Sequence, residues 1–329
     1  MRLFRCATIM LWVTWLMPVL ATSAKAQDTG LGYSGPQNLA NYLNSQLLKA
    51  QNEAQSGALN LAALKKRADH GDAQAELTLG ESYYLGANGA IQDLTQAAAY
   101  FHKAAQQGNA EAQFYFGIMN LNGQGVPQDA AQGAAWYRKA AEQGNVEAQY
   151  SLASLYVAGQ GVPADDAQAV VWYRKAAEQG LVFAEYNLGL FYDLGRGVPQ
   201  DYAQAAAWYR KAAEQKLAFA EYNLGLLYAN GHGVTKDAAQ AAGWYRKAAE
   251  QGDAAAQYDL GIAYANGAGV AQNDANAYFW ISVALQGKLE AGEQAQMEQA
   301  KNVAASYLTV AQRKEVEGRV QKWVQAHSN

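Results

Sequence analysis

Residues that could support catalysis or metal binding are few in this sequence and lie far apart. No two histidines have the His-x-x-x-His spacing that places both imidazoles on one helix face for a zinc ion; the four are His70, His102, His232 and His327. The sequence contains neither Ser-x-x-Lys nor Gly-x-Ser-x-Gly, the serine patterns of penicillin-recognising enzymes and of α/β-hydrolases. It therefore predicts no enzyme, no metal site and no cofactor.

The first 26 residues have the pattern of an export signal. Arg2 and Arg5 precede an apolar run over residues 7–20, and residues 24–26 read Ala-Lys-Ala, with small side chains where a signal peptidase needs them. The run is shorter than the roughly 20 residues of a membrane-spanning helix, so an uncleaved anchor is the less favoured alternative. We expect residues 1–26 to be a cleaved signal peptide and the protein to be periplasmic or secreted.

Charge and cysteine content limit the classes of partner. Residues 1–26 hold three of the 25 basic residues, so the remaining chain has 22 Lys and Arg against 29 Asp and Glu, a net charge of −7. An acidic chain is a poor match for nucleic acid or an anionic membrane surface. Cys6, the only cysteine, lies within the signal, so neither disulfides nor thiol chemistry are expected. The expected partner is a protein or peptide, with no nucleic acid and no membrane span after signal cleavage.

A strict internal period organises the rest of the chain. Five tryptophans recur every 36 residues: Trp136, Trp172, Trp208, Trp244 and Trp280. A period of this length is the mark of one supersecondary unit stacked in a row. Six repeats begin near Asp72, Asn109, Asn145, Leu181, Leu217 and Asp253.

Each repeat predicts two helices joined by a tight turn. In the third repeat, Ala148, Leu152 and Leu155 have the spacing of one buried helix face. Residues 159–163 read Gly-Gln-Gly-Val-Pro, which we interpret as a structural turn because no Gly-Lys-Ser or Gly-Lys-Thr of a phosphate loop follows. An Asp then caps the second helix with a Gln three residues later. This pair recurs as Asp93 with Gln96, Asp129 with Gln132, Asp165 with Gln168, Asp201 with Gln204, and Asp237 with Gln240.

The second helices share Trp-Tyr-Arg-Lys or a close variant. We expect their tryptophans to fill the gap between neighbouring repeats. We expect each arginine to pair with the Glu four residues later on a solvated face; these arginines are Arg138, Arg174, Arg210 and Arg246. Gly180 follows the second helix of the third repeat, at the C-cap, where the backbone commonly adopts a positive φ. Lys216 occupies the equivalent position in the fourth repeat. We expect the joint at Lys216 to bend differently.

Less regular segments flank the repeats. Residues 27–71 predict a short disordered stretch and N-terminal capping helices, the six repeats cover 72–287, and residues 288–329 predict C-terminal capping helices. The last two helices are expected at about 290–305 and 310–325, with a capping box between Thr309 and Gln312. Such caps cover the open ends of a repeat stack.

The repeat resembles a known family. Its pattern Ala-x-x-x-Leu-Gly-x-x-Tyr, Gly-x-Gly-Val-x-x-Asp and Ala-x-x-Trp-Tyr-x-Lys-Ala-Ala-x-x-Gly is similar to the Sel1-like repeat, a relative of the tetratricopeptide (TPR) repeat. In the fourth repeat the matching residues are Ala184, Leu188, Gly189, Tyr192, Gly195, Gly197, Val198, Asp201, Ala205, Trp208, Tyr209, Lys211, Ala212 and Ala213, and Lys216 departs from the final Gly. The resemblance implies an all-α, right-handed α-solenoid of antiparallel helix pairs, usually an adaptor rather than a catalyst.

The resemblance also suggests a function. Exported bacterial members are similar to regulators of envelope signalling, polysaccharide-export scaffolds and host-interaction factors. It therefore implies a scaffold that mediates protein–protein interaction through its concave surface, in cell-envelope regulation or assembly. Two alternatives stay open: a small-ligand or peptidoglycan-fragment binder with at most weak β-lactamase-like hydrolase activity, and a secreted host-interaction factor.

A column of side chains is the candidate interaction surface. At 100° per residue, Tyr150 and Ser154 lie roughly opposite the apolar stripe of their helix. The equivalent positions of the second to sixth repeats are Phe114, Tyr150, Tyr186, Tyr222 and Tyr258, beside Ile118, Ser154, Leu190, Leu226 and Ile262, with Ser151, Asn187, Asn223 and Asp259 as polar neighbours. Tyrosine offers a large contact area and a hydroxyl at little entropic cost. Either the column is open to a partner, or its rings pack on neighbouring first helices and are mostly buried.

Overall fold

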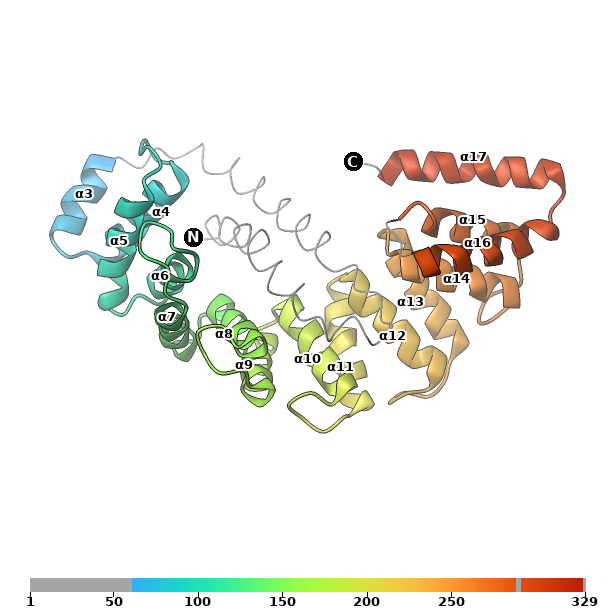
Figure 1. Ribbon diagram of the computed structural model, residues 1–329, viewed down its shortest axis with the longest axis horizontal. Helices are drawn as coiled ribbons and strands as arrows, with labels where there is room; N and C mark the ends of the chain where they lie inside the picture. The colour runs from blue at the N-terminus through green and yellow to red at the C-terminus, as the bar shows by residue number, and fades with distance from the viewer. Residues whose placement is uncertain (1–60, 288–290, 328–329) are drawn as a thin grey trace. The chain divides into compact units, whose positions relative to one another are not determined.

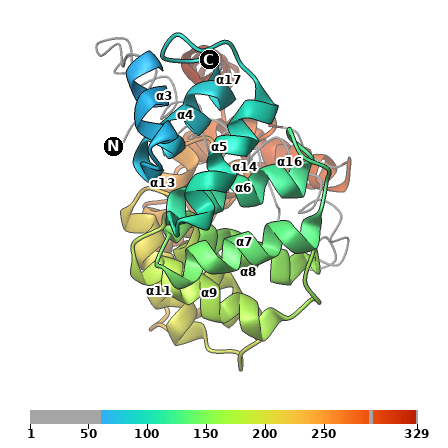
Figure 2. The ribbon, with the colours of Figure 1, turned by 90° about the vertical axis from the view of Figure 1, so that its left-hand side faces the viewer.

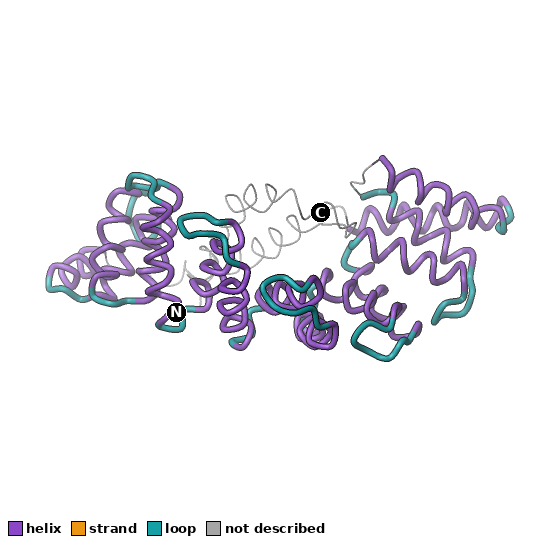
Figure 3. Tube along the Cα trace, turned by 60° about the horizontal axis from the view of Figure 1, so that its bottom comes forward, coloured by secondary structure: helices purple, strands orange, loops and turns teal. Residues whose placement is uncertain are grey.

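The computed structural model describes residues 61–287 and 291–327, and all regular elements within these ranges are α-helices. Short loops join them (Figure 3). Consecutive helices pack as pairs (Figure 1), which confirms the predicted all-α solenoid class. The predicted signal peptide and the disordered stretch after it lie outside the described residues.

Six helix pairs account for the repeats. The first helices are α4 (Ala73–Leu85), α6 (Ala110–Asn122), α8 (Val146–Ala158), α10 (Val182–Leu194), α12 (Ala218–Asn230) and α14 (Ala254–Asn266). The second helices are α5 (Leu94–Gln106), α7 (Ala130–Glu142), α9 (Asp166–Glu178), α11 (Tyr202–Glu214), α13 (Ala238–Glu250) and α15 (Asp274–Ala284). The flanking helices are α3 (Leu61–Asp69), α16 (Ala291–Ser306) and α17 (Val310–His327).

The chain divides after Leu181 into two compact units. The N-terminal unit contains α3 to α9 and faces the viewer in Figure 2. The C-terminal unit contains α10 to α17. Each is described by itself below.

The predicted aspartate caps are present. Asp129 has an extended backbone (φ −147°), and its carboxylate accepts a hydrogen bond from the Gln132 backbone nitrogen at 2.9 Å. The equivalent bonds form at Asp93, Asp165, Asp201 and Asp237. Each satisfies an amide that the first turn of a helix leaves without a backbone partner.

Lys216 does not change the joint that it occupies. It adopts a φ of +63°, close to the +83° of Gly180. Its backbone nitrogen donates to Ala213 O at 2.9 Å and that of Leu217 to Ala212 O at 3.2 Å, the same pair of bonds that Gly180 and Leu181 make. The expectation of a different bend is therefore wrong, because these bonds hold a left-handed lysine in the glycine geometry, at a strain of about 1 kcal/mol.

In the first, second, fourth and fifth repeats, a buried ring of the second helix lies over a first-helix glycine. A Cβ on Gly225 would lie 2.7 Å from Tyr245 ring atoms, and one on Gly189 would lie 2.7 Å from the Tyr209 ring. Phe101 lies over Gly80 and Tyr137 over Gly117 in the same way. The glycine of the Leu-Gly pair therefore admits an aromatic ring into the close approach of two helices.

The tryptophans and their basic neighbours form the opposite side of the second helices. Trp244 packs against a core cluster that the fourth and fifth repeats share, and Trp280 against one that the fifth and sixth share, so these indoles lie where adjacent repeats meet, as expected. The Lys three residues after each Trp lies over its indole, with Nζ 3.7–4.1 Å from the ring centroid in the second to fifth repeats. A cation over an aromatic face is favourable by about 0.5–1 kcal/mol at an exposed site.

Three of the second-helix arginines, Arg138, Arg210 and Arg246, bond to a tyrosine of the next repeat. Arg138 Nη2 donates to the hydroxyl of Tyr156 at 2.6 Å. Arg210 donates to Tyr228 at 2.9 Å and Arg246 to Tyr264 at 2.8 Å. The predicted pairing within one helix is wrong here, because the stacked first helix brings a tyrosine hydroxyl within reach of the guanidinium.

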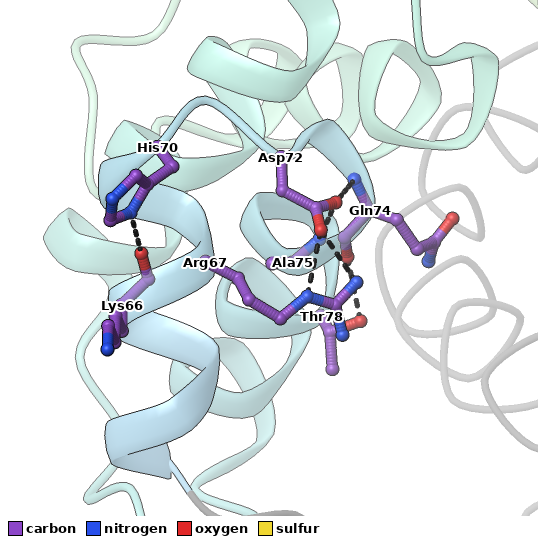
Figure 4. A network of polar contacts seen from close by, with 7 residues as sticks. All are labelled: Lys66, Arg67, His70, Asp72, Gln74, Ala75 and Thr78. Carbon is purple, nitrogen blue, oxygen red and sulfur yellow. Dashed lines mark hydrogen bonds and ion pairs between the residues drawn. The ribbon is translucent and has the colours of Figure 1, made fainter.

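Additional helices lie at both ends. At the N-terminal end, Arg67 forms an ion pair with Asp72 (2.6 Å), whose carboxylate also accepts from the backbone nitrogens of Gln74 and Ala75 (Figure 4). At the other end, α17 packs on α15 through Val316 and Val320. The predicted capping box opens α17: Thr309 N donates to Gln312 Oε1 at 2.9 Å, and Gln312 N donates to Thr309 Oγ1 at 3.3 Å.

In the second, third, fifth and sixth repeats, the second glycine of the turn touches the preceding repeat. A Cβ on Gly233 would lie 2.3 Å from the carbonyl oxygen of Tyr202, and one on Gly269 would lie 2.0 Å from that of Ala238. Gly125 and Gly161 meet Leu94 and Ala130 in the N-terminal unit in the same way. The turn of one repeat thus rests on the first turn of the preceding second helix.

We predict that Gly233→Ala lowers the free energy of unfolding by about 3 kcal/mol, because it combines a positive φ with a backbone collision. Gly252→Ala shares the positive φ (+93°) but meets nothing within 4 Å, and should cost about 1 kcal/mol. Gly243→Ala, in an open helical position, should stabilise by up to about 1 kcal/mol. Urea unfolding of the three variants tests this order; equal losses for Gly233→Ala and Gly252→Ala would contradict the collision.

Candidate functional site

The first helices of the repeats carry no positive charge. In the C-terminal unit, α10, α12 and α14 contain four acidic residues, Glu185, Asp193, Glu221 and Asp259, and neither Lys, Arg nor His. The basic residues of these repeats lie on the second helices and in the loops. The fourth and fifth repeats therefore separate an acidic, aromatic first helix from a second helix that carries Arg and Lys.

In the N-terminal unit the predicted column is largely covered. Phe114 and Ile118 are each only 3% exposed. The Phe114 ring lies 5.3 Å from that of Tyr137, and Tyr150 is half-buried at 5.5 Å from Tyr173, between ring centroids. The sequence predicts that Phe114 and Ile118 contact a partner, but both are buried. The reason is that the first helix packs on its second helix along a wider face than the apolar stripe that the sequence periodicity predicts.

In the C-terminal unit the column is half-exposed. Tyr186 and Tyr222 each pack one side of the ring on a second-helix tyrosine, at centroid distances of 5.8 Å from Tyr209 and from Tyr245. The half-buried positions of this surface are Tyr186, Asn187, Leu190, Tyr222, Asn223, Leu226, Tyr258, Asp259 and Ile262, and we call them the first-helix face. The structure thus brings together the predicted residues of the fourth to sixth repeats as a partly accessible surface.

Two carboxylates on this unit are held by tyrosine hydroxyls. Tyr222 donates to Asp259 Oδ2 at 3.0 Å, and Tyr209 donates to Asp193 Oδ2 at 3.2 Å. Asn223 also hydrogen-bonds to the Tyr209 side chain. Burial raises the pKa of both Asp193 and Asp259, and the neutral hydroxyl donors only partly offset it. Hydrogen-bond acceptors beside aromatic rings suit recognition rather than catalysis.

Asp193 is the residue of this site that the sequence prediction missed. Its equivalents in the neighbouring repeats are Leu121, Val157, Ala229 and Ala265. The sequence does contain a signal for this residue, because Asp193 is an acid at a position where the neighbouring repeats have apolar residues. Its contact with Tyr209 depends on how two helices pack, which the period does not show.

A polar contact repeats at the other end of the first helices. Buried Glu or Gln accepts a hydrogen bond from the Gln at the end of its own second helix, as in Gln251 Nε2 to Glu221 Oε2 at 2.6 Å. Where the acceptor is Gln, its amide also donates to the preceding repeat: Gln149 accepts from Gln179 at 2.8 Å and donates to Ala141 O at 3.0 Å. An ionised Glu cannot make that second bond. Burial accordingly raises the pKa of Glu221 to about 6 and also raises that of Glu185.

A cleft of about 500 Å³ lies among α15, α16 and α17, lined by Tyr278, Ser282, Lys301, Glu317 and others. Its charged groups already have partners: Tyr278 donates to Glu317 at 3.2 Å, and Lys301 pairs with Glu298 at 2.7 Å. Ser282 Oγ is the one buried side-chain polar atom without a partner in the described chain. This cleft does not contact the first-helix face residues named above.

Two further classes of site were searched over the described ranges. There, no three His, Cys, Asp or Glu side chains gather to hold a metal ion. Within the same ranges, no helix has both the length and the apolarity needed to cross a bilayer.

The stacked helix pairs form a solenoid with a partly exposed aromatic face, which is the architecture of a scaffold protein. The Sel1 repeat family matches residues 73–109, 110–145, 146–181, 182–217, 218–253 and 254–286. The chain therefore belongs to the Sel1 repeat family. Sel1 repeats generally mediate protein interactions, and the family is generally a non-enzymatic scaffold.

Two solved structures support this assignment. The chain is 37% identical to c5321, a protective antigen present in uropathogenic Escherichia coli strains that displays an SLR fold, with a TM-score of 0.66 over 74% of this chain and 56% of that one. It is 35% identical to a Sel1 repeat protein from Oxalobacter formigenes, with a TM-score of 0.55 over 66% of this chain and 89% of that one. This chain thus spans little more than half the length of c5321. Comparison with curated protein sequences gave no match.

We predict that Glu221→Gln stabilises the protein at pH 7.5 by about 1 kcal/mol, because the amide keeps the bond from Gln251 and adds a donor without a buried charge. The folded-state pKa of about 6 exceeds the ordinary 4.5, so the stability that protonated Glu221 contributes is complete below about pH 4.5 and is lost as the pH rises through 6. Glu221→Gln should flatten the pH dependence in that window.

The reciprocal change provides the control. Gln149→Glu should lower stability at pH 7.5 and introduce a similar pH dependence, because it keeps the bond from Gln179 but replaces the amide that donates to Ala141. Thermal unfolding between pH 4 and 8 measures both. A loss of stability with Glu221→Gln at pH 7.5 would contradict this account of the contact.

Proposed function

We propose that this protein is a scaffold that binds a protein or peptide partner on the first-helix face of its C-terminal unit. The observation that carries this proposal is the half-exposed column of tyrosine, asparagine and aliphatic side chains on α10, α12 and α14. Tyrosine-rich surfaces bind partners well because a large rigid ring loses little entropy on contact. The general role of Sel1 repeats in protein interactions supports the same function.

The partner surface is tested by changing two half-exposed leucines. The double variant Leu190→Ser and Leu226→Ser removes apolar contact area from the first-helix face. Ala207→Ser, at an exposed position of α11, is the matched control away from that face. We expect the parent and the control to retain a specific protein from envelope extract in affinity capture, and the double variant to lose it while its melting temperature shows that it is folded.

Retention of the same protein by the folded double variant would rule out this face as the binding surface. Retention that is lost equally in the Ala207→Ser control would point to the second-helix side instead. Both outcomes are read from the same capture experiment, with quantitative mass spectrometry of the eluted proteins.

We further propose that the protein is exported and works in the cell envelope, in its regulation or assembly. The support is the pattern of residues 1–26, where basic residues precede a short apolar run and a small-residue cleavage site. The expected mature N-terminus is Gln27. Cell fractionation followed by N-terminal sequencing should find this form in the periplasm or the medium. A cytoplasmic protein that retains Met1 would contradict export.

A further inference from the structure

We propose that the partner segment is an extended, cationic peptide with basic side chains three residues apart, and that they bind at Asp193 and Asp259. This proposal rests on the function proposed above, since it names the chemistry of the partner that the first-helix face accepts. It is carried by the charge of the face, by the hydrogen bonding of the two carboxylates and by the spacing of the repeats.

The first helices that form the face carry acids and no cations, and the nearby loop cation Arg196 lies over the Phe191 ring, 4.9 Å from its centroid. The helices α10, α12 and α14 contain no Lys, Arg or His, whereas the Lys and Arg side chains of α11 and α13 lie over indoles or donate to tyrosines on the basic side. The loop residue His232 influences Asp193 electrostatically but stacks on Tyr202, 4.7 Å between ring centroids. A positively charged partner therefore complements this face, and a negatively charged one is repelled.

The two carboxylates have neutral hydrogen-bond donors. Tyr222 donates to Asp259 and Tyr209 to Asp193, and each Asp is half-buried. Burial removes water that would stabilise the charge of a carboxylate. A hydrogen bond from a phenol hydroxyl replaces less of that stabilisation than a hydrogen bond from a cation would. Tyr222, which is half-buried, also places its ring near Asp259, where it adds a cation–π contact for an ammonium or guanidinium group. Each Asp with its Tyr therefore favours one basic side chain.

The spacing of the repeats sets the spacing of the basic residues. Tyr209, which holds Asp193, also bonds to Asn223, and Asn223 is the equivalent of Asp259 one repeat earlier. The two carboxylates therefore lie about one repeat apart along the face. A polyproline II segment advances about 3.1 Å per residue and returns to the same side every third residue. We assign one basic residue of such a segment, at i and at i+3, to each carboxylate.

A designed peptide tests this assignment. The probe is a fluorescein-labelled peptide containing Arg-Pro-Pro-Arg, titrated with the purified protein by fluorescence anisotropy. We expect saturable binding that weakens at least tenfold when Gln replaces both arginines, and at least threefold when the order is Arg-Arg-Pro-Pro. Binding should also weaken as salt rises from 50 to 500 mM, because these charges are partly exposed.

Variants of the protein locate the site. Asp259→Asn keeps an acceptor for Tyr222 but removes the charge, and should weaken binding of the Arg-Pro-Pro-Arg peptide about tenfold; Asp193→Asn should act similarly. Glu214→Gln removes one charge from an exposed position of α11 and should change the affinity less than twofold. Equal losses for Asp259→Asn and Glu214→Gln, or equal binding of a Glu-Pro-Pro-Glu peptide, would overturn the proposal.

The outcome for the scaffold function is separate. If the Arg-Pro-Pro-Arg peptide does not bind while protein capture still depends on Leu190 and Leu226, the cationic specificity is wrong and the scaffold function stands. If the peptide does not bind and capture is independent of these leucines, both proposals fail. Circular dichroism of each variant confirms that a loss of binding is not a loss of fold.

Discussion

The packing of an aromatic ring over a glycine is the constraint on which both the core and the candidate site depend. Tyr209 is fully buried above Gly189, and this contact sets how closely α10 and α11 approach. The hydroxyl of the same tyrosine bonds to Asp193, so the residue that fills the core also positions a carboxylate of the site.

Contacts between repeats use the same few positions throughout the chain, and their variation changes stability rather than architecture. Turn glycines such as Gly233 rest on the preceding second helix, and arginines such as Arg210 reach the tyrosine of the following repeat. At the buried Glu or Gln position both side chains accept the same bond, but only Gln also donates to the preceding repeat. Glu221 therefore lacks the donor that Gln offers to the preceding repeat, and burial raises its pKa to about 6.

The separation of charge gives the scaffold two unlike sides. On the second helices, lysines lie over indoles and arginines bond to tyrosines, so much of the positive charge takes part in holding repeats together. On the first helices, the acids accept hydrogen bonds only from neutral donors. Asp259 and Asp193 accept from tyrosine hydroxyls, which do not neutralise their negative charge, so they favour a positively charged partner group. Membership of the Sel1 repeat family accounts for the stacked helix pairs. What distinguishes this chain's surface is the set of residues that differ between its repeats, such as Asp193.

The sequence by itself determined what depends on neighbouring residues in the chain. The 36-residue period, the aspartate caps and the capping box at Thr309 follow from local hydrogen bonding and helical periodicity, and all are present in the structure. Only the tertiary structure decided which faces are covered and which side chains meet across helices. Phe114 is buried, Arg138 bonds to Tyr156 rather than to Glu142, and Asp193 meets Tyr209, because these contacts depend on the distances between packed helices, which a linear pattern does not contain.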